Sequence, residues 1–294
     1  MKTEADIKDM VRRKYSEIAS QSTAFNRSSC CGATESSTEV YNIMSDSYES
    51  LDGYSEEADL GLGCGLPTAF AMINKGDTVV DLGSGAGNDC FVARHECGAE
   101  GKVIGVDFSE VMVEKARHNA DALGFNNVEF RLGDIENMPI GDGRADVVVS
   151  NCVLNLLPNK SRIFGEIFRV LKPGGHFSIS DVVLKGQLPQ ALVEDAEMYA
   201  GCVSGAIQKS EYLAYIEKAG FIDVRIQKEK AIVLPTDLLS KYQDAEGVAK
   251  VLSGEVGILS LTVYAQKPTT AENTVKPRVK LSDIQKCAPN SGCC

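Results

Sequence analysis

The stretch Asp81-Leu82-Gly83-Ser84-Gly85-Ala86-Gly87 decides the fold of this chain. It begins within a segment at 78–82 that predicts a strand, and it leads into a segment near 87–97 that predicts a helix. Glycines at such a turn allow positive φ and let a ligand approach the backbone closely. A dinucleotide fingerprint needs its third glycine at position 88, which is Asn88 here.

Alternating strand and helix patterns continue on the carboxyl side of this turn. Ser109 is a candidate N-cap for a helix near 109–123, and Gly124 a candidate stop. Continuous Val and Ile runs between helices predict a parallel sheet covered on both faces. We therefore expect a doubly wound, mostly parallel, seven-stranded Rossmann-like α/β sheet. Further strands are expected at 102–107, 128–132, 145–150, 176–182, 222–234 and 257–266, and helices near 159–171, 210–219 and within 235–256.

The flanking segments differ from the alternating core. Residues 4–20 carry apolar side chains at helical spacing, whereas 21–40 and 41–68 are expected to form loops over the core. Residues 189–209 predict a helix that contains Cys202, and 268–286 have a linker composition. We expect an N-terminal cover at 1–68, a core at 69–268 with an insertion at about 185–210, and a linker with a Cys-rich tail at 269–294.

Composition limits the classes of partner. The 294-residue chain has a net charge of -11 with scattered basic residues, which favours a small-molecule substrate over nucleic acid. It contains no apolar run of about 18 residues and no apolar segment near Met1, so we expect neither a membrane span nor a signal peptide, and a cytoplasmic location. The chain has ten cysteines but no CxxC pair, so the sequence does not favour a structural zinc site.

Carboxylates stand at the ends of the first three predicted strands. Asp107 can accept hydrogen bonds from ribose hydroxyls, and Asp134 from an adenine amino group with Ile135 against the ring. With the glycine turn and Leu171-Lys172-Pro173-Gly174-Gly175, residues 70–185 resemble the class I S-adenosylmethionine-dependent methyltransferases. That resemblance implies S-adenosylmethionine as cofactor. The residues expected to contact it are Asp81, Gly83, Ser84, Gly85, Gly87, Asp107, Phe108, Met112, Gly133, Asp134, Ile135 and Asn151.

Three isolated cysteines lie beside small residues or at a strand end. Cys64 is flanked by glycines, Cys152 follows the fourth predicted strand, and Cys202 follows Gly201. A buried cysteine is often only a small hydrophobe. Thiolates are also the soft ligands that trivalent arsenic requires, and an arsenic lone pair needs no general base. We expect His95, His118 and His176 to be surface or packing residues, and no Asn/Asp-Pro-Pro-aromatic motif follows the fourth strand.

Five motifs together resemble the arsenite methyltransferases across about residues 14–268. The resemblance implies that Cys152 and Cys202 bind trivalent arsenic, and that Cys64 ligates it or forms a disulfide during turnover. It also implies a redox partner at Cys30 or Cys31, a thioredoxin or glutathione reductant, and a monomer. The motifs are Tyr48-Glu49-Ser50-Leu51-Asp52-Gly53-Tyr54, Gly63-Cys64-Gly65-Leu66-Pro67, residues 81–90, Ser150-Asn151-Cys152-Val153-Leu154-Asn155-Leu156 and Tyr199-Ala200-Gly201-Cys202-Val203-Ser204-Gly205-Ala206.

One position departs from that pattern. Leu62 stands where the family often has an aromatic residue, whose ring would contribute about 0.5–2 kcal/mol near a cation unless Tyr54 or another ring replaces it. We interpret Cys90 and Cys97 as structural residues. For Cys287, Cys293 and Cys294, the sequence supports a role in capturing the metalloid and the absence of any binding role equally well. The alternatives are methylation of another soft element or of an organic acceptor, and a metalloid-binding protein with little turnover.

Overall fold

The computed structural model describes residues 3–20, 47–187, 203, 205–232, 239–240 and 244–269. Within them, a seven-stranded sheet has the order β3-β2-β1-β4-β5-β7-β6. All pairs from β3 to β5 are parallel, and β7 is antiparallel to both β5 and β6. The strands are β1 Thr78–Leu82, β2 Lys102–Asp107, β3 Val128–Leu132, β4 Ala145–Asn151, β5 Leu171–Lys185, β6 Ile222–Ile232 and β7 Gly257–Gln266. The predicted doubly wound fold is confirmed.

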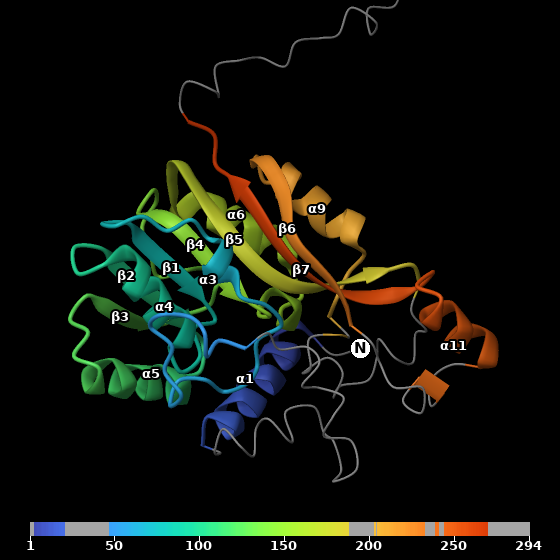
Figure 1. The fold of residues 1–294 in the computed structure, drawn as a ribbon, viewed down its shortest axis with the longest axis horizontal. Helices are drawn as coiled ribbons and strands as arrows, with labels where there is room; N and C mark the ends of the chain where they lie inside the picture. The colour runs from blue at the N-terminus through green and yellow to red at the C-terminus, as the bar shows by residue number, and fades with distance from the viewer. Residues whose placement is uncertain are drawn as a thin grey trace, which may run out of the picture.

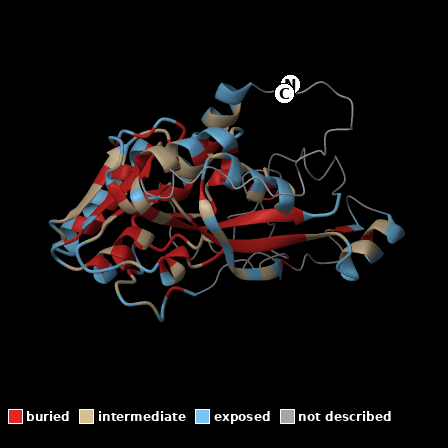
Figure 2. Ribbon diagram, turned by 90° about the horizontal axis from the view of Figure 1, so that it is seen from above, coloured by how far each residue is buried: buried red, intermediate tan, exposed pale blue. Residues whose placement is uncertain are grey.

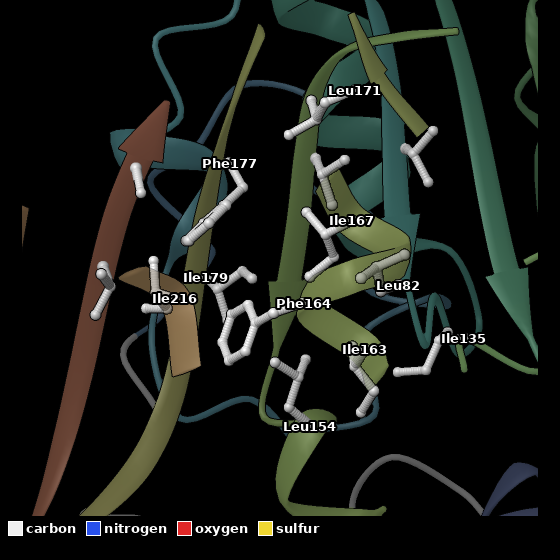
Figure 3. Close-up of a cluster of buried hydrophobic side chains, with 14 of the residues drawn as sticks. Leu82, Ile135, Leu154, Ile163, Phe164, Ile167, Leu171, Phe177, Ile179 and Ile216 are labelled. Carbon is white, nitrogen blue, oxygen red and sulfur yellow. The ribbon is translucent and has the colours of Figure 1, made fainter. Parts of the chain in front are cut away.

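Helices cover both faces of this sheet (Figure 1). The helices are α1 Glu4–Ser20, α3 Pro67–Phe70, α4 Asn88–Cys97, α5 Glu110–Ala122, α6 Lys160–Val170, α9 Lys209–Lys218 and α11 Ala245–Leu252, with a 3-10 turn, η1, at Leu154–Leu156. On one face, Ile163, Phe164 and Ile167 of α6 point toward the sheet (Figure 3) and pack with Ile216 of α9. The opposite face is covered by α4, α5 and α1, whose Phe91, Met112 and Ile18 share a second cluster. This double cover explains the continuous apolar strands.

Helix boundaries follow the expected chemistry. The Ser109 side chain accepts a hydrogen bond from Met112 N at the start of α5, and Gly124 adopts φ +68° just past its end. In α1, Val11 and Ile18 are buried, as the apolar spacing predicted. The predicted strand at 176–182 is longer in the structure, because β5 continues its antiparallel pairing with β7 as far as Lys185. These long strands form the buried ribbon seen in Figure 2.

One expected helix differs from the structure. Residues 205–208, assigned to a helix over 189–209, form a turn and a short bridge instead: Leu184 N donates to Ile207 O at 2.8 Å, and Leu184 pairs with Gln208 in parallel. Backbone groups of β5 at Leu184 give residues 207 and 208 hydrogen-bond partners, and these contacts outweigh the local helical propensity of the segment. Residues 189–202 of that prediction, which include Cys202, and residue 204 lie outside the described residues, as do the tail at 270–294 and Cys30 and Cys31. No described helix is long and apolar enough to cross a membrane.

Candidate active site

The turn between β1 and α4 lies over the end of β2. Gly83 N and Ser84 N both donate to Val106 O, at 2.8 and 3.1 Å. Gly85 adopts φ +50°, and a Cβ placed there would meet no heavy atom within 4 Å. The hydroxyl oxygen of Ser84 is buried without a protein hydrogen-bond partner. The turn therefore offers open space and an unused polar group to a ligand.

Two of the predicted ligand-contacting glycines pack closely against neighbouring side chains. A Cβ on Gly87 would lie 2.8 Å from the Phe91 ring and 2.9 Å from that of Phe130, and its φ is +101°. A Cβ on Gly133 would lie 2.6 Å from Pro139. Neither residue is among those lining the cavity described below. Close packing accounts for glycine at both positions, and their contact with the cofactor stays a prediction.

Asp107, at the end of β2, is a buried carboxylate at the centre of this region. Its Oδ2 accepts from Gly85 N at 3.0 Å, and its Oδ1 accepts from Ser109 N at 2.8 Å. Burial raises the pKa of Asp107 to about 6, although these backbone N–H groups oppose the shift. Phe108 and Met112 follow Asp107 in the chain, and all three residues line the cavity described below. This placement agrees with the predicted ribose-binding role.

Asp134 has a different partner from the one predicted. Lys8 Nζ of α1 donates to both Asp134 Oδ2 and Glu136 Oε2, each at 2.6 Å. Asp134 does not line the cavity, and Ile135 is buried in the core cluster beneath α6. Contact of Asp134 and Ile135 with adenine stays a prediction, and it requires adenine to approach a carboxylate already engaged by α1.

A single cavity gathers most of the remaining predicted residues. Its volume, including the part open to solvent, is about 790 Å³, in the range of small-ligand sites. Four carboxylates face it, from Asp59, Asp81, Asp89 and Asp107, so it favours a cationic ligand. The lining residues are Tyr15, Tyr48, Ala58, Asp59, Leu60, Leu62, Gly63, Asp81, Gly83, Ser84, Gly85, Ala86, Asn88, Asp89, Asp107, Phe108, Met112, Asn151, Cys152, Val153 and Leu156.

Two of these carboxylates sit in buried polar pairs. The Cys90 thiol donates to Asp81 Oδ2 at 3.2 Å, and burial with the nearby Asp89 charge raises the pKa of Asp81 well above its usual range. The Tyr48 hydroxyl donates to Asp89 Oδ2 at 2.8 Å, and Thr68 donates to Oδ1 at 3.3 Å. Burial raises the pKa of Asp89 to about 6 despite these hydrogen bonds. A bound cation at this wall would favour the ionised carboxylates.

Sequence reasoning missed several lining residues. Tyr15, Tyr48, Asp59 and Asp89 were not predicted as site residues, although Tyr48 and Asp89 belong to quoted motifs. Leu62 lines the cavity together with the rings of Tyr15 and Tyr48, and the Tyr54 hydroxyl donates to Asp59 at 3.2 Å. Which ring, if any, replaces the family's aromatic residue stays a prediction. The three histidines are all described, and none lines the cavity.

Cys64 and Cys152 belong to one buried cluster near this cavity. Both side chains are buried, and the cluster also contains Val11, Leu156 and Val203. Cys152 lines the cavity and adopts φ +61°, a left-handed conformation uncommon for a residue with a Cβ. Its N–H donates to Ser180 O at 2.8 Å, which holds the turn after β4. The structure thus brings together two thiols separated by 88 positions.

The third predicted thiol, Cys202, lies outside the described residues, as do Cys30 and Cys31. Val203, which is described, packs in the cluster of Cys64 and Cys152. Among the described residues, no three His, Cys, Asp or Glu side chains are arranged to hold a metal ion. Convergence of all three thiols therefore stays a prediction.

The described residues fit S-adenosylmethionine. The open space at Gly85, the unpartnered hydroxyl of Ser84 and the strand-end carboxylate of Asp107 suit the polar groups of the nucleoside. The carboxyl groups of Asp81 and Asp89 line the cavity, where a bound sulfonium or ammonium group would favour their ionised forms. These residues come from the ends of β1 and β2 and from the start of α4, where open α/β sheets bind ligands.

Fold and cavity together define a class I S-adenosylmethionine-dependent methyltransferase, and the model of a methyltransferase domain family matches residues 73–220. An arsenite methyltransferase of Halobacterium salinarum is 38% identical over 276 residues, which is 90% of this chain and 67% of that protein. The human arsenite methyltransferase is 31% identical over 81% of this chain and 64% of its own length. This chain belongs to the arsenite methyltransferase family.

A solved structure agrees with this assignment. The arsenic(III) S-adenosylmethionine methyltransferase of Chlamydomonas reinhardtii is 34% identical and superposes with a TM-score of 0.58. The match covers 70% of this chain and 68% of that one. The chain thus spans about two thirds of the length of the arsenite methyltransferases it matches.

Proposed function

We propose that this protein transfers methyl groups from S-adenosylmethionine to trivalent arsenic held by thiolates. The observation that carries the proposal is the common burial of Cys64 and Cys152, with Cys152 on the wall of the acidic cavity. Thiolates suit a soft metalloid, and the carboxylates of the cavity suit a cationic donor. The family to which the chain belongs supports the same substrate.

The proposed reaction needs no protein base. S-adenosylmethionine supplies an electrophilic methyl group on a cationic sulfur. The lone pair of thiolate-bound arsenic forms the arsenic–carbon bond in line, while the carbon–sulfur bond breaks and its electrons stay on the sulfur of S-adenosylhomocysteine. The arsenic would thereby be oxidised from the trivalent to the pentavalent state. Two thiols of thioredoxin or glutathione would give two electrons to the arsenic and become a disulfide, which returns the arsenic to the trivalent state. Repeated cycles would give mono-, di- and trimethyl products and serve arsenic detoxification.

Each residue group has its own role in this proposal. Asp107 and the glycine turn bind the donor, and the carboxylates of Asp81 and Asp89 orient its cationic end. Cys64, Cys152 and Cys202 bind the arsenic, while Cys30 or Cys31 exchanges with them as a redox partner. Cys152 is buried, so arsenic bound to its sulfur would be partly shielded from water.

The remaining expectations belong to the same proposal. Thioredoxin or glutathione would supply the thiols, and a reducing cytoplasm would keep the cysteines in the dithiol form that binds arsenic. We propose a monomer, with a cover at 1–68, a catalytic core at 69–268 and a tail at 269–294. The described part of the cover supports this division, because Tyr15 of α1 and Tyr48 of the following loop both line the cavity.

The test is separation of methylated arsenicals by chromatography with mass detection. Reduced protein receives arsenite, S-adenosylmethionine and thioredoxin or glutathione, beside the Cys152→Ser, Cys64→Ser and Cys202→Ser variants. Cys97→Ser is the control, because Cys97 is buried in α4 against Arg94 O and Gly98 O and does not line the cavity.

The expected result is product from wild type and Cys97→Ser, with none from Cys152→Ser or Cys202→Ser and less from Cys64→Ser. Turnover that survives both Cys152→Ser and Cys202→Ser would reject thiolate-held arsenic and point to an organic acceptor. Arsenite binding without product would indicate a metalloid-binding protein.

A further inference from the structure

Asn151 connects the two described thiols. It is the last residue of β4 and directly precedes Cys152, while its side chain reaches the loop that carries Cys64. Asn151 Oδ1 accepts from Cys64 N at 3.1 Å, and Nδ2 donates to Gly65 O at 2.8 Å. One amide group therefore binds the backbone on both sides of Cys64.

The rest of the Asn151 amide is also engaged by protein groups. Nδ2 donates to the Tyr48 hydroxyl, and it lies 3.5 Å from Asp89 Oδ2. The Cys64 thiol lies 3.9 Å from Oδ1, within reach of a weak sulfur hydrogen bond. An amide group has two N–H donors and one carbonyl acceptor, and all three have partners here. Asn151 also lines the cavity, and the cofactor contact that the sequence predicted for it stays a prediction.

The glycines beside Cys64 are explained by this contact. A Cβ on Gly63 would lie 2.6 Å from Asn151 Nδ2, and one on Gly65 would lie 2.6 Å from the Ser180 hydroxyl oxygen. Any side chain at either position would push the loop away from β4 and β5. Close packing against Asn151 and Ser180 accounts for glycine at these two positions.

A second hydroxyl binds the same loop from another strand. Ser260 of β7 donates to Cys64 O at 2.6 Å, and Ser260 is buried. The two peptide groups that flank the Cys64 Cα thus have partners on different strands, Asn151 from β4 and Ser260 from β7. Ser260 does not line the cavity, so its role can be separated from cofactor binding.

We propose that Asn151 is a positioning residue for the arsenic-binding thiols, and that its amide group, with the Ser260 hydroxyl, fixes Cys64 beside Cys152. This inference rests on the proposed function. One metalloid bound by two thiols requires their sulfurs at a defined separation, and a loop held in that geometry loses less conformational freedom on binding. Without the amide group, Cys64 stays in the chain but no longer has a fixed place relative to Cys152.

The test compares Asn151→Ala and Ser260→Ala with a matched control, Asn155→Ala. Asn155 is another buried amide, four residues further on, which donates to Val182 O at 2.6 Å and does not contact the Cys64 loop. Three quantities are measured: the KM for arsenite, the calorimetric Kd of arsenite without donor, and the Kd of S-adenosylhomocysteine. Arsenite binding is counted as the part that Cys152→Ser removes, because other cysteines also take up arsenite.

We expect Asn151→Ala to raise both arsenite constants at least fivefold, and Ser260→Ala at least threefold. The Kd of S-adenosylhomocysteine should change less than twofold in Ser260→Ala, because Ser260 does not line the cavity, and Asn155→Ala should leave all three constants within twofold. If Asn151→Ala instead weakens S-adenosylhomocysteine and leaves arsenite binding unchanged, Asn151 binds the cofactor and the proposal is wrong. Equal losses in all three variants would show a general loss of stability and would also overturn it.

Two further outcomes separate this proposal from the function itself. If Asn151→Ala does not fold, as judged by thermal unfolding, Ser260→Ala decides the test, because its predicted effect is on arsenite alone. If wild type binds arsenite but forms no methylated product, the proposed function fails while the binding constants still test the positioning role. If wild type does not bind arsenite, both proposals fail.

Discussion

The backbone N–H of Gly85 donates to the Asp107 carboxylate across 3.0 Å, so the turn after β1 is joined directly to the end of β2. The contact positions the carboxylate at the base of the cavity and leaves the space above Gly85 open. Both residues are therefore placed for one ligand, although 22 positions separate them in the chain.

Replacement of Asp107 tests its proposed ribose contact. Asp107→Asn removes an anionic acceptor, and a hydrogen bond to a charged group contributes about 1.5–3 kcal/mol, so the affinity for S-adenosylhomocysteine should fall about tenfold to a hundredfold. Calorimetric titration measures this change. Asp121→Asn, on the exposed side of α5, should leave the affinity unchanged. An unaltered affinity in Asp107→Asn would remove Asp107 from the cofactor site.

Gly85 and Gly143 form a matched pair for the glycine turn. They adopt φ +50° and +60°, and a Cβ at either position meets no heavy atom within 4 Å. Alanine should therefore destabilise both variants by about 1–2 kcal/mol through backbone strain alone. Only Gly85→Ala should also weaken S-adenosylhomocysteine binding, because Gly85 lines the cavity. Urea unfolding and calorimetry measure the two effects, and equal binding in both variants would contradict the placement of the ligand.

The contact of α1 with the end of β3 depends on Lys8. Glu136 is only 2% exposed, and its Oε1 has no protein partner, so Lys8→Met would leave a buried carboxylate uncompensated. We expect a loss of about 1–3 kcal/mol in the free energy of unfolding, with partial recovery in Lys8→Met/Glu136→Gln. Arg12→Met, which removes an exposed pair with Asp9, should change stability by less than about 1 kcal/mol. If the losses in unfolding free energy from Lys8→Met and Glu136→Gln simply add in the double variant, the two side chains are not coupled.

The buried carboxyl of Asp181 gives a pH-dependent stability. Burial raises the pKa of Asp181 to about 7, partly opposed by the charge of Lys160, whereas an unfolded Asp titrates near pH 4. The folded state binds this proton more tightly, so its stabilising contribution is complete below about pH 4 and is lost as the pH rises through 7. Between pH 5 and pH 8, wild type should therefore lose about 1–3 kcal/mol relative to Asp181→Asn in urea unfolding. A difference independent of pH would show that Asp181 titrates normally.

Local patterns in the sequence were enough to predict the sheet, the glycine turn and the strand-end carboxylates. Each of these depends on neighbours in the chain: apolar runs form buried strands, and glycines at a strand end allow the turn. Asp81 and Asp107 lie at strand ends as expected, because parallel strands place their carboxyl ends on one edge of the sheet. The candidate arsenic ligands were also named from sequence, through motifs around Cys64 and Cys152.

Partners that lie far apart in the chain were decided only by the tertiary structure. Lys8 engages Asp134 from 126 positions away, Tyr48 donates to Asp89, and Asn151 and Ser260 bind the Cys64 loop from 87 and 196 positions away. Hydrogen bonds extend only about 3 Å, so the order and register of the strands select which polar groups can meet. The sequence by itself therefore determined the fold class and the chemical types of residue at the site, and the packed sheet decided which of them act on one another.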